Sequence, residues 1–122
     1  MIQWFNAIED KDRASFIQFD IDKFYPSISE NLLKSALEWA SDLVDISDQD
    51  RHIILSTKKN LLYSEGTPWT KRGGSECDVT MGSWDGAEVC DLIGLFSLAK
   101  CESENLGVNI GLYGDDGLGV FF

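Results

Sequence analysis

The sequence predicts an α+β fold in which helices cover one face of an antiparallel sheet. Residues 15–22 form an apolar run of strand-forming residues, and residues 108–122 form two more such runs around a Gly-Asp-Asp-Gly turn. Between them, residues 28–62 and 86–100 carry apolar side chains at helical spacing. The expected order is therefore strand, helix, helix, hairpin, loop, helix and hairpin.

Length and charge limit the possible functions. The chain has 122 residues, of which 43% are hydrophobic, which is enough for one packed domain over residues 1–122. It holds 10 Lys and Arg residues against 21 Asp and Glu residues, and its formal net charge is −11. A self-sufficient nucleic-acid-binding protein would carry a basic stripe. The balance instead fits a metal-binding piece whose basic surfaces lie on other segments.

Cysteine usage and the absence of long apolar runs indicate the cellular compartment of the protein. Cys77, Cys90 and Cys101 show no metal-ligand spacing, and their odd number favours free thiols in a reducing compartment. No signal peptide is recognisable, and no apolar run is long enough to span a bilayer. We therefore expect an intracellular protein with no membrane partner.

The first half of the chain is expected to bring a strand end next to a helix. Residues 1–14 have the pattern of the end of an amphipathic helix. The strand that follows is apolar at most positions, which predicts burial on both faces, and it leads to Asp22. Ser27 and Glu30 have capping-box spacing at the start of a helix. That helix carries one apolar stripe: Ile28, Leu32, Leu33, Ala36, Leu37, Ala40 and Val44.

The second half is expected to contain a hairpin and the most buried helix. Residues 47–62 predict a second helix with acidic residues in its first turn. Residues 63–78 indicate a short hairpin anchored by Trp69, with the basic pair at 71–72 on its solvated edge. Residues 86–100 are apolar nearly all round, which predicts the central buried helix.

Two adjacent carboxylates, Asp115 and Asp116, occupy the turn of the last hairpin. Because Asp and Gly are favoured turn residues, a solvated hairpin tip would explain the pair by itself. Asp20 changes the interpretation, because it ends the first strand and can lie next to that tip. Three such carboxylates can hold two cations about 3.5–4 Å apart, the arrangement used for phosphoryl displacement. Oxygen-only ligation favours Mg²⁺ or Mn²⁺ over zinc.

Three motifs follow one another in a fixed order. Residues 19–28 contain an Asp at a strand end with a Tyr five positions later. Residues 81–86 form a Met-Gly-Ser-Trp-Asp-Gly loop before the buried helix, and residues 113–116 are Tyr-Gly-Asp-Asp on a hairpin. Together they resemble the catalytic palm of the reverse transcriptase family over roughly residues 15–122.

The resemblance implies a metal centre at the strand ends. Asp20, Asp115 and Asp116 match the catalytic aspartates of the family, and together with Ile21 they would hold two Mg²⁺ or Mn²⁺ ions.

The resemblance also implies contacts to the nucleotide and to the nucleic acid. Tyr25 matches the aromatic residue that packs under the nucleotide sugar, and Phe24, in the same nucleotide-binding stretch, is expected to point into the core. Gly82 matches the glycine that backs the templating base pair. Met81, where the family usually has Gln, and Tyr113 would contact template and primer.

The implied activity is RNA-directed DNA polymerisation by two-metal nucleotidyl transfer. The partners would be an RNA template, a DNA primer and deoxynucleoside triphosphates. An aromatic ring at Tyr25 would clash with a ribonucleotide 2′-hydroxyl. RNA-directed RNA polymerases also carry a Gly-Asp-Asp turn, but they generally have a carboxylate at that first-motif position.

The resemblance implies that the chain is a partial palm. Fingers segments are expected before residue 1, and a thumb with a later palm lysine after residue 122. Two alternatives stay open: a non-catalytic palm-like interaction or relic domain, in which the three acids have lost their role, and an RNA-directed RNA polymerase.

Overall fold

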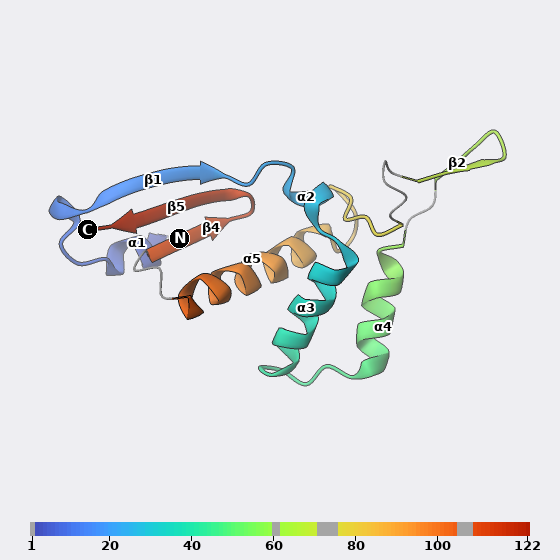
Figure 1. The fold of residues 1–122 in the computed structure, drawn as a ribbon, viewed down its shortest axis with the longest axis horizontal. Coiled ribbons are helices and arrows are strands. Elements are labelled where there is room, and N and C mark those ends of the chain that lie inside the picture. The colour runs from blue at the N-terminus through green and yellow to red at the C-terminus, as the bar shows by residue number, and fades with distance from the viewer. Residues whose placement is uncertain (1, 60–61, 71–75, 105–108) are drawn as a thin grey trace.

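The computed structural model describes residues 2–59, 62–70, 76–104 and 109–122 (Figure 1). The elements in chain order are α1 (Ile2–Ala7), the short 3₁₀ helix η1 (Lys11–Arg13), β1 (Ser15–Asp20), α2 (Phe24–Ser27), α3 (Glu30–Ser41), α4 (Asp48–Thr57), β2 (Leu62–Ser64), β3 (Thr67–Trp69), α5 (Gly86–Ser103), β4 (Asn109–Tyr113) and β5 (Asp116–Phe121). The fold is α+β with antiparallel sheets, which confirms the expected class.

The main sheet has three antiparallel strands in the order β1-β5-β4. The first strand therefore lies beside the final hairpin, as the sequence predicts, and its partner is the last strand of that hairpin. In this register Asp20 lies opposite Asp116, and Tyr113 lies opposite Asp116 on the other side. The pairing brings the two ends of the chain together along one sheet.

Burial of β1 on both faces, expected from its apolar sequence, is wrong. Phe16 is 45% exposed and Ile17 is 51% exposed. The physical reason is position, because β1 is an edge strand and α5 packs against the opposite edge strand, β4. The central strand β5 is the more buried one, and its Val120 side chain is fully buried.

Helices lie on both faces of the sheet rather than on one. Neighbouring strand residues point to opposite faces, and Gly111 and Leu112 of β4 meet different helices. The ring of Trp4 in α1 lies over Gly111, whereas Leu112 approaches Gly94 of α5. The expectation of one covered face therefore holds for α5, and the short α1 covers part of the other.

The main core lies between α3 and α5, away from the sheet. Its buried members in α3 are Leu33, Ala36 and Leu37, and the stripe predicted for this helix is thus confirmed at its centre. Val44, the last residue of the predicted stripe, lies beyond the helix end and is 60% exposed. The N-cap is Ser29 rather than Ser27, and its hydroxyl accepts a hydrogen bond from the Leu32 amide.

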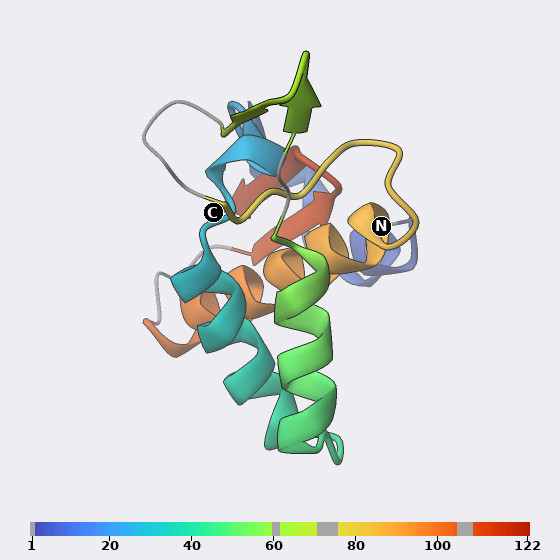
Figure 2. The ribbon, with the colours of Figure 1, turned by 90° about the vertical axis from the view of Figure 1, so that its right-hand side faces the viewer.

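The helix α4 lies beside α3, and a short hairpin projects beyond it (Figure 2). The predicted helix start with acids in its first turn is confirmed, and Ser47 and Asp50 form a capping box there. The helix ends at Thr57, so Leu62 belongs to β2 and not to the helix. Trp69 does not anchor the hairpin, because its side chain is 58% exposed and, among the described residues, β2 and β3 form a two-stranded sheet of their own.

The helix α5 is central, as predicted, and it runs three residues further than expected, to Ser103. It packs against α3 on one side and β4 on the other. Leu61, Lys71 and Arg72, to which the sequence assigned a helix stripe and a hairpin edge, lie outside the described residues. None of the helices in the described ranges combines the length and apolar character that crossing a bilayer requires.

Candidate functional site

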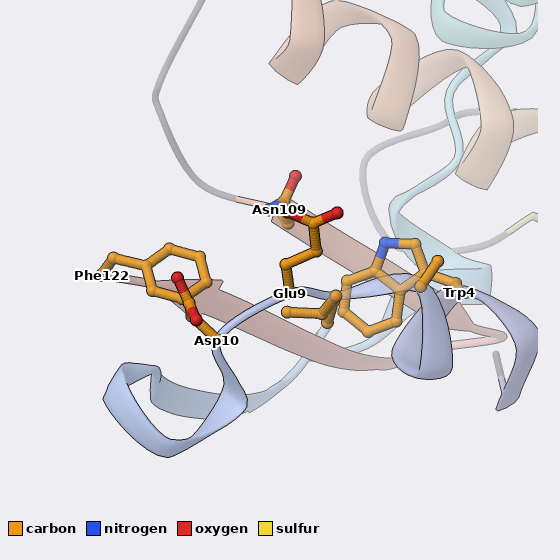
Figure 3. A pocket seen from close by; sticks show the side chains of 7 residues that line it. Trp4, Glu9, Asp10, Asn109 and Phe122 are labelled. Carbon is orange, nitrogen blue, oxygen red and sulfur yellow. The ribbon is translucent and has the colours of Figure 1, made fainter.

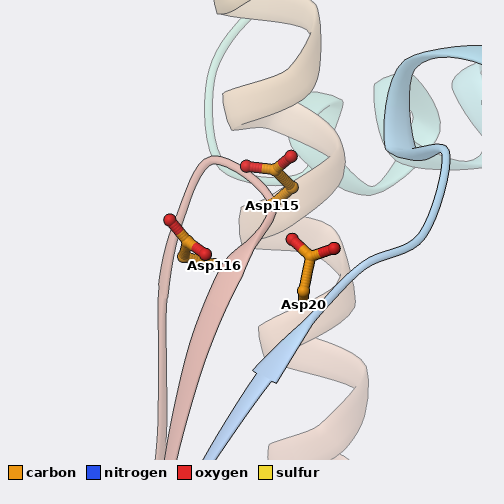
Figure 4. A group of neighbouring side chains, drawn as sticks. All are labelled: Asp20, Asp115 and Asp116. Carbon is orange, nitrogen blue, oxygen red and sulfur yellow. The ribbon is translucent and has the colours of Figure 1, made fainter.

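Three acidic side chains meet at one end of the main sheet. Asp20 is the last residue of β1, Asp116 is the first residue of β5, and Asp115 lies in the turn between β4 and β5 (Figure 4). One carboxylate oxygen from each lies within 4.8 Å of the others, and all three residues are exposed. The geometric expectation from the sequence is thereby confirmed, since the strand end and the hairpin tip lie side by side.

Backbone contacts fix this meeting point. Gly114 has φ +60°, the left-handed conformation that glycine adopts without strain. The Ile21 amide donates a hydrogen bond of 2.8 Å to the Asp115 carbonyl oxygen and joins the turn to the end of β1. The acids are therefore held together by the ladder and the turn, not by attraction between their side chains.

An open pocket of about 350 Å³ lies next to Asp116. Gln18, Leu118 and Tyr113 line it together with Asp116 and Gly117. Gln18 pairs with Leu118, two positions from the Asp20–Asp116 pair, so these side chains share one sheet face. Tyr113 is 76% exposed. The face that carries the acids thus also offers space for a ligand.

Phe24 and Tyr25 have the different environments that the sequence predicts. Phe24 is 7% exposed and belongs to the core, so its side chain is not available to a nucleotide. Tyr25 is half-buried against that core, whose members include Cys90. The charge of Cys90 and partial burial raise the pKa of Tyr25, and the carboxylates of Asp115 and Asp91 raise it further.

The loop before α5 contains Met81 and Gly82. Gly82 has φ +82°, and open space surrounds its α-carbon. A side chain there would strain the backbone without meeting a neighbour. Met81 is 75% exposed. Both residues are exposed, and they belong to the segment that precedes α5, whereas the three acids belong to β1 and the final hairpin.

A buried ion pair that sequence reasoning missed holds this loop. The Lys58 side chain is 4% exposed, and its ammonium contacts the carboxylate of Asp85, which is 33% exposed. Asp85 precedes α5, but its side chain makes no capping hydrogen bond. The two residues are 27 positions apart, and no local pattern could have joined them.

A larger open cavity lies at the other end of the sheet. It has a volume of about 440 Å³, and Trp4, Glu9, Asp10, Asn109 and Phe122 border it together with Ala7 and Ile8 (Figure 3). Phe122 follows β5 at the end opposite Asp116, so this cavity is separate from the acidic group.

The acidic group and the pocket beside Asp116 lie together and form the candidate site. Tyr25, against the core, and the Met81–Gly82 loop, before α5, lie on other segments of the chain. Comparisons with protein-family models, with curated proteins and with solved structures find no match to this chain.

Proposed function

We propose that residues 1–122 form the palm segment of an RNA-directed DNA polymerase of the reverse transcriptase type. The observation that carries the proposal is the group of three carboxylates, Asp20, Asp115 and Asp116, with oxygens within 4.8 Å of one another. Two further observations support it: the first and last strands are paired, and Tyr25, five residues after Asp20, is partly buried against the core.

The donor set fits hard divalent cations. Carboxylate oxygens are the ligands that Mg²⁺ and Mn²⁺ prefer, and exposed acids so close together repel one another without a cation. Asp20, Asp115 and Asp116 would hold the ions, and the Ile21 backbone adjoins them. When bound, such ions supply positive charge for activating a primer 3′-hydroxyl and for stabilising a pyrophosphate leaving group.

The remaining candidate residues receive roles that follow from their positions. We assign the pocket beside Asp116, bordered by Tyr113, to the primer end. Tyr25 would contact the sugar of the incoming deoxynucleotide, while Phe24 supports it from the core. Met81 and Gly82 would face the template. With a net charge of −11, this segment would offer little grip on phosphates by itself, so the proposed polymerase would bind nucleic acid mainly through other, basic segments.

A non-catalytic interaction domain is the second candidate. The short hairpin formed by β2 and β3 favours it, because Leu62, Tyr63 and Trp69 are 71%, 70% and 58% exposed. Exposed apolar side chains gathered on one short hairpin are a feature of protein contact surfaces. In such a domain the three acids would be dispensable.

The deciding experiment is RNA-templated primer extension by this palm joined to fingers and thumb segments from its own reading frame. With Mg²⁺ and deoxynucleotides the parent should extend the primer. Asp20→Asn, Asp115→Asn and Asp116→Asn should each lower the rate by at least about a hundredfold, the scale of losing one electrostatic catalytic contact. Glu38→Gln, an exposed acid on α3, is the matched control and should extend like the parent. A parent without extension, or aspartate variants as active as Glu38→Gln, would overturn the proposal and favour the interaction domain.

A further inference from the structure

The loop between Asp78 and Asp85 is closed at both ends by one residue, Lys58. The Asp78 amide donates a hydrogen bond of 2.8 Å to the Lys58 carbonyl oxygen, next to the end of α4 (Figures 1 and 2). The Lys58 ammonium pairs with the Asp85 carboxylate at the other end of the loop. Lys59 pairs with Cys77 in an isolated antiparallel bridge just before the loop. The backbone and the side chain of Lys58 therefore fix the two ends of one segment.

Lys58 is itself firmly held. It is the C-cap of α4, where its amide donates to the Leu55 carbonyl oxygen at 3.2 Å, and α4 packs against α3. Its side chain is 4% exposed. Because a buried ammonium is unstable without a partner of opposite charge, the Asp85 end of the loop stays attached to it.

The loop is folded tightly between these two ends. The Ser83 amide donates to the Thr80 carbonyl oxygen at 3.1 Å, and the Gly86 amide donates to the Ser83 carbonyl oxygen at 3.3 Å. A β-carbon at Gly86 would lie 2.7 Å from the Thr80 carbonyl oxygen, so the loop leaves no room for a side chain there. Val79, 2% exposed, belongs to the main core. Contacts on several sides therefore hold the tip of the loop.

The tip presents two large apolar side chains to solvent. Trp84 is 98% exposed and Met81 is 75% exposed. Both belong to the loop whose Met81 and Gly82 face the template in the proposed function. An indole ring can stack on any nucleobase, because every base has a π-face. Stacking does not depend on positive charge, of which this chain, with a net charge of −11, has little.

We propose that Trp84 stacks on an unpaired base of the template strand, and that Lys58 is the positioning residue that holds its loop for this contact. The inference rests on the proposed function and adds to it one contact residue and one residue that never meets the substrate. A loop released at its Asp85 end would have to be ordered again on binding. Release should therefore weaken the affinity for template and leave the reaction at the three acids unchanged.

The unpaired template strand provides the test of the stacking contact. In the complete polymerase, Trp84→Ala should weaken binding of a template–primer with a 5′ template overhang by about fivefold or more, the scale of one lost base stack. It should bind a blunt-ended duplex like the parent. Trp84→Phe keeps an aromatic ring and should recover most of the affinity. An equal loss on both duplexes, or no loss on either, would overturn the contact.

The double variant Lys58→Met with Asp85→Ala tests the positioning role, because it removes the ion pair without leaving a charge unpaired. It should raise the KM for template–primer by about threefold to tenfold, the scale of ordering a released loop. The kcat and the KM for deoxynucleotides should stay unchanged. Lys34→Met with Glu30→Ala makes the same two changes at an exposed pair on α3, and this matched control should behave like the parent.

Chymotrypsin cleavage after Trp84 in residues 1–122 reports the state of the loop without catalysis. The Lys58→Met, Asp85→Ala variant should be cleaved there faster than the parent, because its loop is free at one end. The Lys34→Met, Glu30→Ala control should be cleaved at the rate of the parent.

The outcomes separate the two proposals. A parent polymerase that does not extend primers overturns the proposed function, whereas duplex binding and cleavage need no extension and decide the inference by themselves. A Lys58→Met, Asp85→Ala variant with the template KM or the cleavage rate of the parent overturns the positioning role alone. A control pair that raises the template KM equally also overturns it.

Discussion

Asp20 and Asp116 are directly opposite each other in the last residue pair of the β1–β5 ladder, so that two negatively charged side chains are neighbours across the strands. Like charges directly opposite each other destabilise a strand pair. Asp115, in the adjoining turn, adds a third carboxylate to the same place. Under the proposed function, cations of opposite charge would offset this repulsion, which makes metal binding the first point to test.

Divalent cations should stabilise the protein through this group. Mn²⁺ or Mg²⁺ that binds only the folded chain adds about 2.7 kcal/mol at a hundredfold excess over its Kd, which corresponds to a rise of several degrees in Tm. Asp115→Asn should raise the Tm of the metal-free protein, because it removes one repelling charge, and should reduce the shift caused by metal. Thermal denaturation followed by circular dichroism measures both effects.

The control for the metal experiment is Glu38→Gln, which removes the same charge from the exposed face of α3. It should keep the full metal-dependent shift. A folded parent with no shift at millimolar Mn²⁺, or an equal loss of the shift in Glu38→Gln, would mean that the three acids form no cation site.

The two partners of the Lys58–Asp85 pair should differ in their effect on the free energy of unfolding. Asp85→Ala leaves the Lys58 ammonium unpaired in a place where only 4% of its side chain is exposed, and should cost about 3–5 kcal/mol. Lys58→Met leaves a carboxylate that is one-third exposed and that water can reach, so it should cost clearly less. Urea denaturation measures both.

The double variant Lys58→Met with Asp85→Ala should recover much of the loss seen in Asp85→Ala. If Lys58→Met proves the more damaging single change, then the carboxylate rather than the ammonium is the group that depends on the pair.

Cys90 should make the protein less stable in alkali. Burial raises the pKa of its thiol, and Asp91 and Asp115 raise it further against the opposing effect of the Tyr25 hydrogen bond. An unfolded cysteine loses its proton near pH 8.5. The folded state therefore holds a proton that the unfolded state has lost, and stability falls as pH rises above about 8.5 and through the folded pKa.

Urea midpoints at pH 7 and pH 10 test this effect of Cys90. Cys90→Ala should lose less stability than the parent between the two pH values, whereas Cys101→Ala, at a half-buried position on the same helix, should lose as much as the parent. Equal losses in all three proteins would show that Cys90 does not titrate in this range.

Local sequence patterns predicted most helices and strands and the acidic group. The features that were not predicted depend on contacts between residues far apart in the sequence. The Ser47–Asp50 cap and the Asp20 strand end are local signals, so both were predictable. Burial of Ile17 depends on which strand lies at the sheet edge, which apolar content does not encode. The Lys58–Asp85 pair joins residues far apart in sequence, and neither has a distinctive neighbourhood.

The same distinction applies to Tyr25. Its place five residues after Asp20 is a local signal and marked it as a candidate sugar contact. The core cluster against which Tyr25 packs includes Cys90, which carries no signal of its own, because an isolated cysteine in an apolar helix is typical of core packing. Only the fold brings Tyr25 against that cluster.

Tyr25→Ala should change the sugar preference of the complete polymerase and leave the acidic group in place. The parent should extend an RNA-templated primer with deoxynucleotides and discriminate strongly against ribonucleotides. Removing the ring opens the space that a 2′-hydroxyl needs, so the preference should fall by roughly two to three decades in kcat/KM. Steady-state extension with matched deoxynucleotides and ribonucleotides measures it.

Phe24→Ala is the control for this last prediction, because its side chain is 7% exposed in the core. It should lower the free energy of unfolding by about 3–5 kcal/mol, as large-to-small core changes do, without relaxing sugar selection in the protein that remains folded. If Phe24→Ala relaxes the sugar selection and Tyr25→Ala does not, then the first motif was aligned one residue out of register, and Phe24 rather than Tyr25 is the residue that contacts the sugar. If the parent polymerase prefers ribonucleotides, the Tyr25 ring does not exclude the 2′-hydroxyl. The chain would then belong to an RNA-directed RNA polymerase instead.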